Sequence, residues 1–232
     1  MTFEVSWMTR SITWLRGVRL DGACVLALLC SLAMQPEARA AEPVLTAPRT
    51  TLVVRVYDGA GLAPRDVREA ARVASALLAA SSVEVRWRMC PEASPLGGDA
   101  CRQPLAANEA VLRLVSAREQ MPADTASLGS TLLDRAGRQP VMSTVFIDRV
   151  LQVARRAMTD PTRLAGRAMA HELGHVLLGT SGHSHAGLMR AFWSDESLRG
   201  SESPDWLLLP EQAAAIHANR ARTVEYDVAG GS

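Results

Sequence analysis

The sequence contains no lysine, so all 25 of its basic residues are arginine. These arginines are balanced by 24 acidic residues, which leaves a formal net charge of only +1. Aromatic residues are also scarce, at 4% of the chain, and no block of arginines is interleaved with them. Proteins that bind nucleic acid usually concentrate positive charge and stacking aromatic side chains on one face. We therefore expect no nucleic-acid partner.

A long apolar run is missing as well. The run at residues 23–34 is shorter than the roughly 20 apolar residues that span a bilayer. Arginines precede this run and a small-residue cleavage site follows it: Arg10, Arg16, Arg19, Ala38 and Ala40. This pattern is typical of a secretory signal peptide. We therefore predict a leader over residues 1–40, cleaved after Ala40, and one domain over residues 41–232.

Such a leader predicts a secreted or periplasmic protein with no stable membrane association after cleavage. Two alternatives remain open. Cys30 could be the acylated residue of a lipoprotein, although Leu29 stands where such sites usually carry a small residue. The leader could also stay in place as an N-terminal anchor.

Only four cysteines occur, and removal of the leader leaves Cys90 and Cys101. An exported protein folds in an oxidising compartment, so we expect these two residues to form a disulfide. Closing the short loop between them would add roughly 3 kcal/mol to stability. Zinc ligation by the pair is the weaker alternative, because their spacing matches no common zinc knuckle.

The remaining patterns predict a mixed α/β domain. Residues 51–58 and 83–89 have strand patterns on either side of a helical pattern at residues 64–81, which predicts two parallel strands joined by a helix. Further strands are expected at residues 111–115, 127–133 and 141–147. Gly129 and Ser130 interrupt the fourth strand, which favours a place at the edge of the sheet. An edge strand above a cleft could accept an extended peptide.

Helices follow the last strand. We predict one over residues 150–158 and another from Pro161 to Leu178, with Asp160 as its N-cap and Gly179 as its C-cap. A turn-like stretch over residues 193–205 precedes a last helix over about residues 210–222.

The helix from Pro161 to Leu178 carries the most informative motif, His171-Glu172-Leu173-Gly174-His175. Residues four apart lie on one face of a helix, so His171 and His175 can bind a single metal ion. Four of the five histidines of the chain fall between positions 171 and 185, which a scatter of surface histidines would rarely produce. The alternative is a helix and a loop that each carry two solvated histidines.

A catalytic zinc ion keeps three protein ligands and leaves one position for water. Glu172, beside the two histidines, is the expected general base that takes a proton from that water. Leu173 is expected to pack in the core. Gly174 would permit the close approach of another backbone segment.

This motif, followed by a glycine, a histidine and Leu188-Met189, resembles the active-site segment of the metzincin zinc peptidases. The resemblance implies a mixed sheet with a backing helix, a zinc helix and a small C-terminal helical part. It also implies peptide or protein substrates, a Zn²⁺ cofactor and a methionine in a tight turn beneath the metal. Met189 lies eighteen residues after His171, the spacing found in the matrixin branch.

The third ligand departs from the family pattern, in which a histidine stands ten residues after the first. Ser181 occupies that position here. The zinc helix also has one extra residue before its terminal glycine, which shifts the chain by about 1.5 Å and turns it by about 100°. A longer reversing loop is then needed, and this favours His183 as the third ligand over His185. Glu196 is a third candidate.

The sequence therefore predicts a secreted zinc endopeptidase with Glu172 as catalytic residue and His171, His175 and His183 as metal ligands. Two alternatives remain open. One is a zinc-stabilised binding or scaffold protein whose closed metal site performs no chemistry. The other is a gluzincin-like peptidase that uses Glu196 as its third ligand.

Overall fold

The computed structural model describes residues 49–91, 99–116, 127–133, 140–200 and 204–229. The leader expected over residues 1–40, with both of its cysteines, lies outside the described residues and stays a prediction. Within the described part of the chain, no helix has the length and apolar character needed to cross a bilayer.

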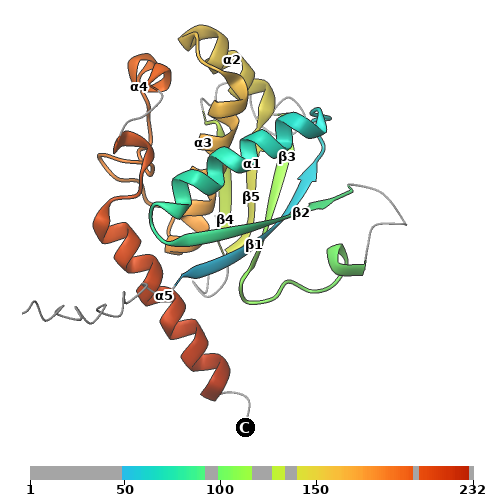
Figure 1. Ribbon diagram of the computed structural model, residues 1–232, viewed down its shortest axis with the longest axis vertical. Coiled ribbons are helices and arrows are strands. Elements are labelled where there is room, and N and C mark those ends of the chain that lie inside the picture. Colours follow the sequence, from blue (N-terminus) through green and yellow to red (C-terminus); the bar gives the residue numbers. More distant parts are fainter. Residues whose placement is uncertain (1–48, 92–98, 117–126, 134–139, 201–203, 230–232) are drawn as a thin grey trace, which may run out of the picture. The chain divides into compact units, whose positions relative to one another are not determined.

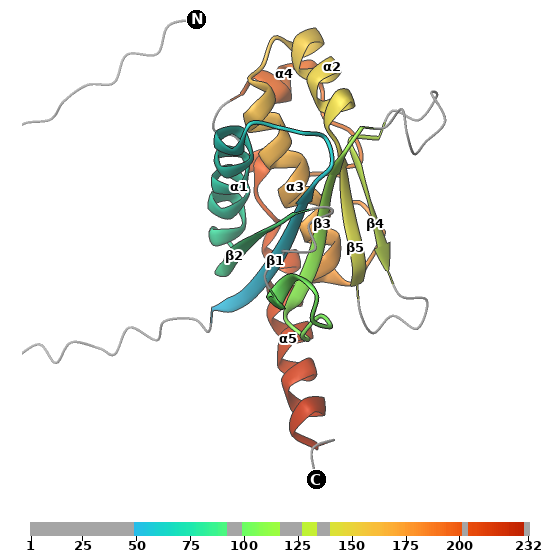
Figure 2. The ribbon, with the colours of Figure 1, turned by 90° about the vertical axis from the view of Figure 1, so that its right-hand side faces the viewer.

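A five-stranded sheet forms the centre of the domain, with the strand order β2-β1-β3-β5-β4 (Figure 2). All neighbouring strands are parallel except β4, which runs antiparallel to β5. The five strands are β1 (Thr50–Asp58), β2 (Val83–Cys90), β3 (Glu109–Val115), β4 (Gly129–Leu133) and β5 (Pro140–Phe146). The predicted mixed α/β class is confirmed, and so is the edge position of the strand at residues 127–133.

Two helices, α1 (Pro64–Ala79) and α3 (Pro161–Leu178), lie side by side over one face of the sheet (Figure 1). Alternate residues of β1 point into this layer, and Leu52, Val54 and Val56 are buried there. The two helices approach closely at Gly166, where a Cβ atom would lie 2.6 Å from the carbonyl oxygen of Ala70. The helix α3 also contacts β4 and β5, which brings the histidine motif to the antiparallel edge of the sheet.

The predicted pair of parallel strands joined by a helix is confirmed as β1, α1 and β2. β1 and β2 pair in parallel, with Thr50 opposite Val83 and Tyr57 opposite Cys90. The predicted disulfide between Cys90 and Cys101 is confirmed, and it joins the end of β2 to a short 3₁₀ turn at Asp99–Cys101.

The largest differences between the predicted elements and the structure lie after β5. The helix α2 (Ile147–Ala157) begins directly after β5, three residues before the predicted start, because Ile147 and Val150 already belong to its buried stripe. The stretch over residues 193–205 contains a short helix, α4 (Asp195–Arg199), whose first turn is capped by the side chain of Ser194. The last helix, α5 (Pro210–Ala229), is longer than predicted.

Candidate metal centre

The helix α3 begins and ends at the predicted residues. The Oδ1 atom of Asp160 accepts a hydrogen bond from the backbone N–H of Arg163 at 2.6 Å, and Pro161 occupies the first helical position. Gly179 ends the helix in the left-handed conformation, with φ 64° and ψ 31°. His171 and His175 therefore lie one turn apart on the same buried face of one rigid helix.

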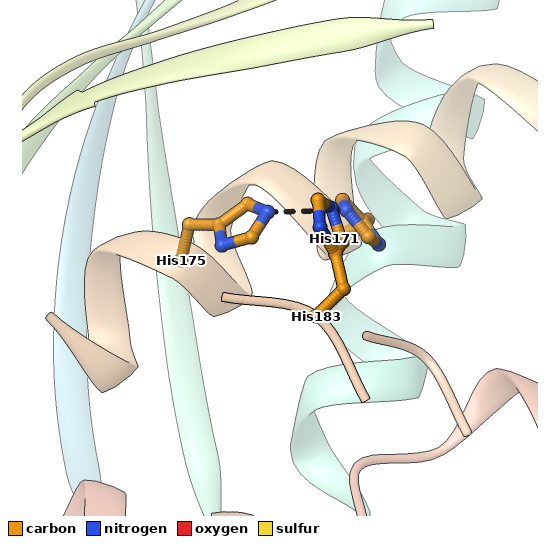
Figure 3. Close-up of side chains that lie close together, drawn as sticks. All are labelled: His171, His175 and His183. Atoms are coloured by element: carbon orange, nitrogen blue, oxygen red, sulfur yellow. Dashed lines mark hydrogen bonds between the residues drawn. The ribbon is translucent and has the colours of Figure 1, made fainter. Parts of the chain in front are cut away.

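Three histidines converge beside this face of α3 (Figure 3). His171 and His175 project from the helix, and His183 reaches them from the loop that follows it. Their nearest ring nitrogens all lie within 4.8 Å of one another. The ring of His183 lies 5.3 Å from that of His171 and 4.9 Å from that of His175, measured between centroids.

Backbone carbonyl groups fix the orientation of both helical imidazoles. The Nδ1 atom of His171 lies 2.8 Å from the carbonyl oxygen of Leu188, and that of His175 lies 2.8 Å from the carbonyl oxygen of Thr180. A carbonyl oxygen can only accept, so each Nδ1 must carry the hydrogen, and each Nε2 is left with a lone pair. This arrangement is typical of histidines that bind metal through Nε2.

The two Nε2 atoms face each other at 3.2 Å, the contact drawn as a dashed line in Figure 3. Two lone pairs at this distance repel each other unless a cation lies between them. Zinc–nitrogen bonds of about 2.0–2.1 Å in a tetrahedral site place two ligand nitrogens about 3.3 Å apart. The separation of His171 and His175 therefore suits a zinc ion.

Both helical imidazoles are held in the neutral form. Burial lowers the pKa of His171 to about 4, against the opposing hydrogen bond to Leu188. Burial also lowers the pKa of His175, and the nearby His183 adds to this effect. Metal ligation requires neutral imidazole, so the environment favours the form that binds.

The loop after α3 is folded so that His183 faces the helix. The backbone N–H of the next residue, Ser184, donates to the carbonyl oxygen of Met189 at 2.8 Å, which closes the loop. Gly187, with φ 73°, makes the turn inside it. A side chain there would meet the carbonyl oxygen of Leu207 at 2.7 Å, so this turn favours glycine for two reasons.

Met189 is fully buried and packs against α3. A Cβ atom at Gly174 would overlap the Sδ atom of Met189. The expectation that Gly174 admits another backbone segment is therefore wrong, because the group that approaches it is the side chain of Met189. The glycine allows this methionine to pack directly against the helix between the two histidines.

The side chain of Glu172 lies between α3 and the edge strand β4. Its Oε2 atom accepts a hydrogen bond from the hydroxyl of Thr131 at 2.7 Å. A Cβ atom at Gly129 would lie 2.6 Å from its Oε1 atom, so β4 leaves room for this carboxyl group. Burial raises the pKa of Glu172 to about 7, although the hydrogen bond from Thr131 opposes the shift.

A cavity of about 950 Å³ opens onto these residues. It lies between β4, one face of α2 and the segment at residues 190–193. The three histidines and Glu172 all line it, so the candidate metal site is accessible from one side.

Ring contacts connect His171 to Trp193, and Trp193 to Trp206. The ring of Trp193 meets that of His171 edge-on, with centroids 5.3 Å apart, and contacts Trp206 at 5.0 Å. The guanidinium of Arg167 stacks over Trp206 at 3.7 Å and donates to the carbonyl oxygen of Leu198 at 2.9 Å. Burial lowers the pKa of Arg167 to about 10, which leaves this group charged at neutral pH.

The other two candidate ligands are placed elsewhere. Within the described residues, the group that could hold a metal contains neither His185 nor Glu196. His185 is exposed on the loop, and Glu196 is exposed on α4. The geometry therefore favours His183 as the third ligand.

No sequence pattern indicated that Thr131 and Gly129 would be neighbours of Glu172. A threonine and a glycine in an interrupted strand carry no motif, and they lie more than forty positions from Glu172 along the chain. Nor did a local pattern identify the carbonyl groups of Thr180 and Leu188 that orient the imidazoles.

No family model and no curated protein matches the sequence. Among solved structures, the chain is similar to an archaemetzincin from Methanopyrus kandleri, with 20% sequence identity, a TM-score of 0.46, and coverage of 75% of this chain and 99% of that chain. It is also similar to metalloproteinase-II from Bacteroides fragilis, with 12% identity, a TM-score of 0.45, and coverage of 75% and 55%. Both TM-scores lie below 0.5, so the function proposed below depends on the residues of the site itself.

Proposed function

We propose that this chain is an exported zinc-dependent endopeptidase that hydrolyses peptide bonds. The observation that carries the proposal is that three convergent histidines and Glu172 line one open cavity. A closed structural zinc site would surround its metal with protein ligands, whereas a catalytic site keeps a position open to water and substrate. The open cavity thus favours catalysis over a scaffold role.

His171, His175 and His183 would hold the zinc ion through their ring nitrogens. When bound, zinc supplies a Lewis acid that makes a water molecule more acidic and polarises a carbonyl group. The neutral imidazoles need lose no proton before they bind it.

Glu172 would act as the general base. Its carboxylate accepts a proton from the attacking water and then donates that proton to the nitrogen of the departing amine. A carboxyl group with a pKa of about 7 can perform both transfers near neutral pH. A nearby positive charge would lower this pKa and increase the fraction of carboxylate.

The strand β4 offers a docking edge for an extended peptide. It pairs with β5 on one side and is the last strand in the order of the sheet. Residues 127–131 line the cavity that also contains the histidines. A peptide paired with β4 would therefore extend across the candidate zinc site, in the manner of β-augmentation.

The test is digestion of a diverse peptide mixture by the zinc-loaded mature chain and by its Glu172→Gln variant. We expect the wild-type chain to cleave peptides and the variant to lose at least about 100-fold in turnover, in line with the loss of a general base. Zinc content, measured by mass spectrometry, should stay at one ion per chain in both.

The matched control is Glu211→Gln, which changes an exposed glutamate in the first turn of α5, outside the cavity. It should behave as the wild type. Retained cleavage by the Glu172→Gln variant would exclude the proposed mechanism. Full zinc with no cleavage by the wild type would favour the scaffold alternative. Export is tested separately, by the mass of the chain recovered outside the cytoplasm, which should begin at Ala41.

A further inference from the structure

Three arginines line the cavity of the candidate metal centre: Arg149, Arg156 and Arg190. The lining contains only one acidic side chain among the described residues, that of Glu172, which is buried beside the histidines. We propose that the cavity selects peptides that carry a carboxylate group, and that Arg149 and Arg156 of α2 bind it. This inference rests on the proposed peptidase function and names a chemical feature of its substrates.

The packing of α2 fixes the direction in which these arginines face. Ile147, Val150, Ala154 and Ala157 form the stripe of α2 that is buried in the core. The cavity is lined by a second stripe, at helical spacings of three and four residues: Arg149, Gln152, Val153 and Arg156. Two guanidinium groups are thus presented on one face of a helix, at positions about 10 Å apart along its axis.

Arg149 lies where α2 meets the beginning of the edge strand. Its Nη1 atom lies 3.4 Å from the carbonyl oxygen of Ser127, two residues before β4, and its guanidinium lies 5.6 Å from the ring centroid of Phe146. Ser127 also lines the cavity. A peptide paired with β4 would therefore pass within reach of Arg149.

Arg156 lies one helical heptad further along the same stripe. It forms an ion pair with Asp195 of α4 at 3.0 Å, but the two side chains are 59% and 42% exposed. Exposed ion pairs of this kind are weak, so a substrate carboxylate can compete with Asp195 for the guanidinium. An arginine binds a carboxylate through two parallel hydrogen bonds, which adds geometric selectivity.

The cavity lining also contains apolar side chains, among them those of Val153, Ala168, Trp193 and Leu198. The combination suits a group that has a carboxylate at its end and an apolar stem. Two parts of a peptide have this chemistry: an acidic side chain, and the free C-terminus of a peptide that ends near the cleavage site. The experiment below separates them.

The first series consists of peptide pairs in which one position carries glutamate in one member and glutamine in the other, with each position tested in turn. Binding of both members is measured with the zinc-loaded Glu172→Gln protein. Their kcat/KM values are measured with the wild type. A second series compares a free C-terminal carboxylate with the C-terminal amide. We expect at least a 10-fold preference for the carboxylate member at one position. An effect of glutamate alone identifies an acidic side chain, and an effect of the terminus alone identifies the free C-terminus.

The ratio of kcat/KM for the carboxylate member to kcat/KM for the neutral member is then measured for Arg149→Gln, Arg156→Gln and the double variant. This ratio should fall toward one in these variants. The charge-reversed double variant, Arg149→Glu with Arg156→Glu, should reverse the ratio in favour of the neutral member of each pair. The control is Arg65→Gln on α1, 84% exposed and outside the cavity, which should keep the wild-type ratio. Circular dichroism verifies that each variant is folded.

Equal binding and equal kcat/KM for every carboxylate and neutral pair would overturn this inference and leave the peptidase proposal intact. A preference that survives in the double arginine variant would overturn it as well. Absence of cleavage of any peptide would contradict the proposed function instead, and the binding series would still test the role of the arginines.

Discussion

The hydroxyl of Thr131 donates a hydrogen bond to the Oε2 atom of Glu172 at 2.7 Å, which joins the edge strand β4 to the helix α3. The hydroxyl oxygen of Thr131 also lies 2.9 Å from the hydroxyl oxygen of Ser143 on β5. The carboxyl group of Glu172 is therefore held by β4, the strand on which we propose that the substrate docks. Thr131 acts on the reaction through Glu172, as a positioning residue.

Thr131→Val removes the hydroxyl and keeps the shape of the side chain. We expect kcat to fall about 10-fold with little change in KM, because the general base loses a partner that fixes its orientation. Thr131→Ser, which restores the hydroxyl, should recover most of the activity. Zinc content should be unchanged in both variants. If the valine and serine variants lose activity equally, the hydroxyl has no role in positioning Glu172.

His183→Ala and His185→Ala separate the two candidate loop ligands. We expect the His183 variant to lose zinc affinity by at least about 100-fold and the His185 variant to bind zinc as the wild type does, because His183 is the one of these two loop residues that joins the helical histidines. Zinc per chain after dialysis against a weak chelator is the measurement. Loss of zinc from the His185 variant alone would reverse the assignment, and full zinc in both would point to Glu196.

Replacement of both Cys90 and Cys101 by serine should lower the melting temperature of the oxidised protein. The closed loop is short, with a sequence separation of 11 residues, and such a bridge contributes roughly 3 kcal/mol. In a domain of this size that corresponds to about 6–12 °C. Calorimetry of both proteins with equal zinc content provides the comparison. An unchanged melting temperature would show that the bridge does not stabilise the fold.

Glu109 should contribute to the free energy of unfolding at neutral pH and lose this contribution in acid. Burial alone would raise the pKa of Glu109, but the backbone N–H of Ala106 and the guanidinium groups of Arg55 and Arg88 outweigh burial and hold this pKa below 4.5. A carboxyl group whose pKa is lower in the folded state stabilises the fold above its unfolded pKa, and this contribution is lost as the pH falls through the folded pKa.

The matched comparison is the wild type against Glu109→Gln in urea unfolding at several pH values. At pH 7 the variant should have the lower free energy of unfolding. The difference should narrow as the pH falls below about 4.5, the ordinary pKa of the carboxyl group. If the wild type and Glu109→Gln differ in free energy of unfolding by the same amount at pH 7 and pH 3, the ionised carboxylate of Glu109 is not the source of the stabilisation.

The sequence by itself determined the local elements. The period of the apolar residues predicted the first strand, helix and strand, and Asp160, Pro161 and Gly179 predicted both ends of α3. The spacing of His171 and His175 then placed two imidazoles on one face. All of these features depend on residues within a few turns of one another, so local patterns are sufficient to predict them.

Only the tertiary structure decided what surrounds these histidines. The strand order β2-β1-β3-β5-β4 brings Thr131 to Glu172 across 41 positions of the chain, and the core packing of α2 turns Arg149 toward the same cavity. Long-range contacts of this kind depend on the pairing of strands and the packing of helices, which no local periodicity encodes. The way His183 meets the helix was likewise set by the hydrogen bond that closes its loop, from the backbone N–H of Ser184 to the carbonyl oxygen of Met189.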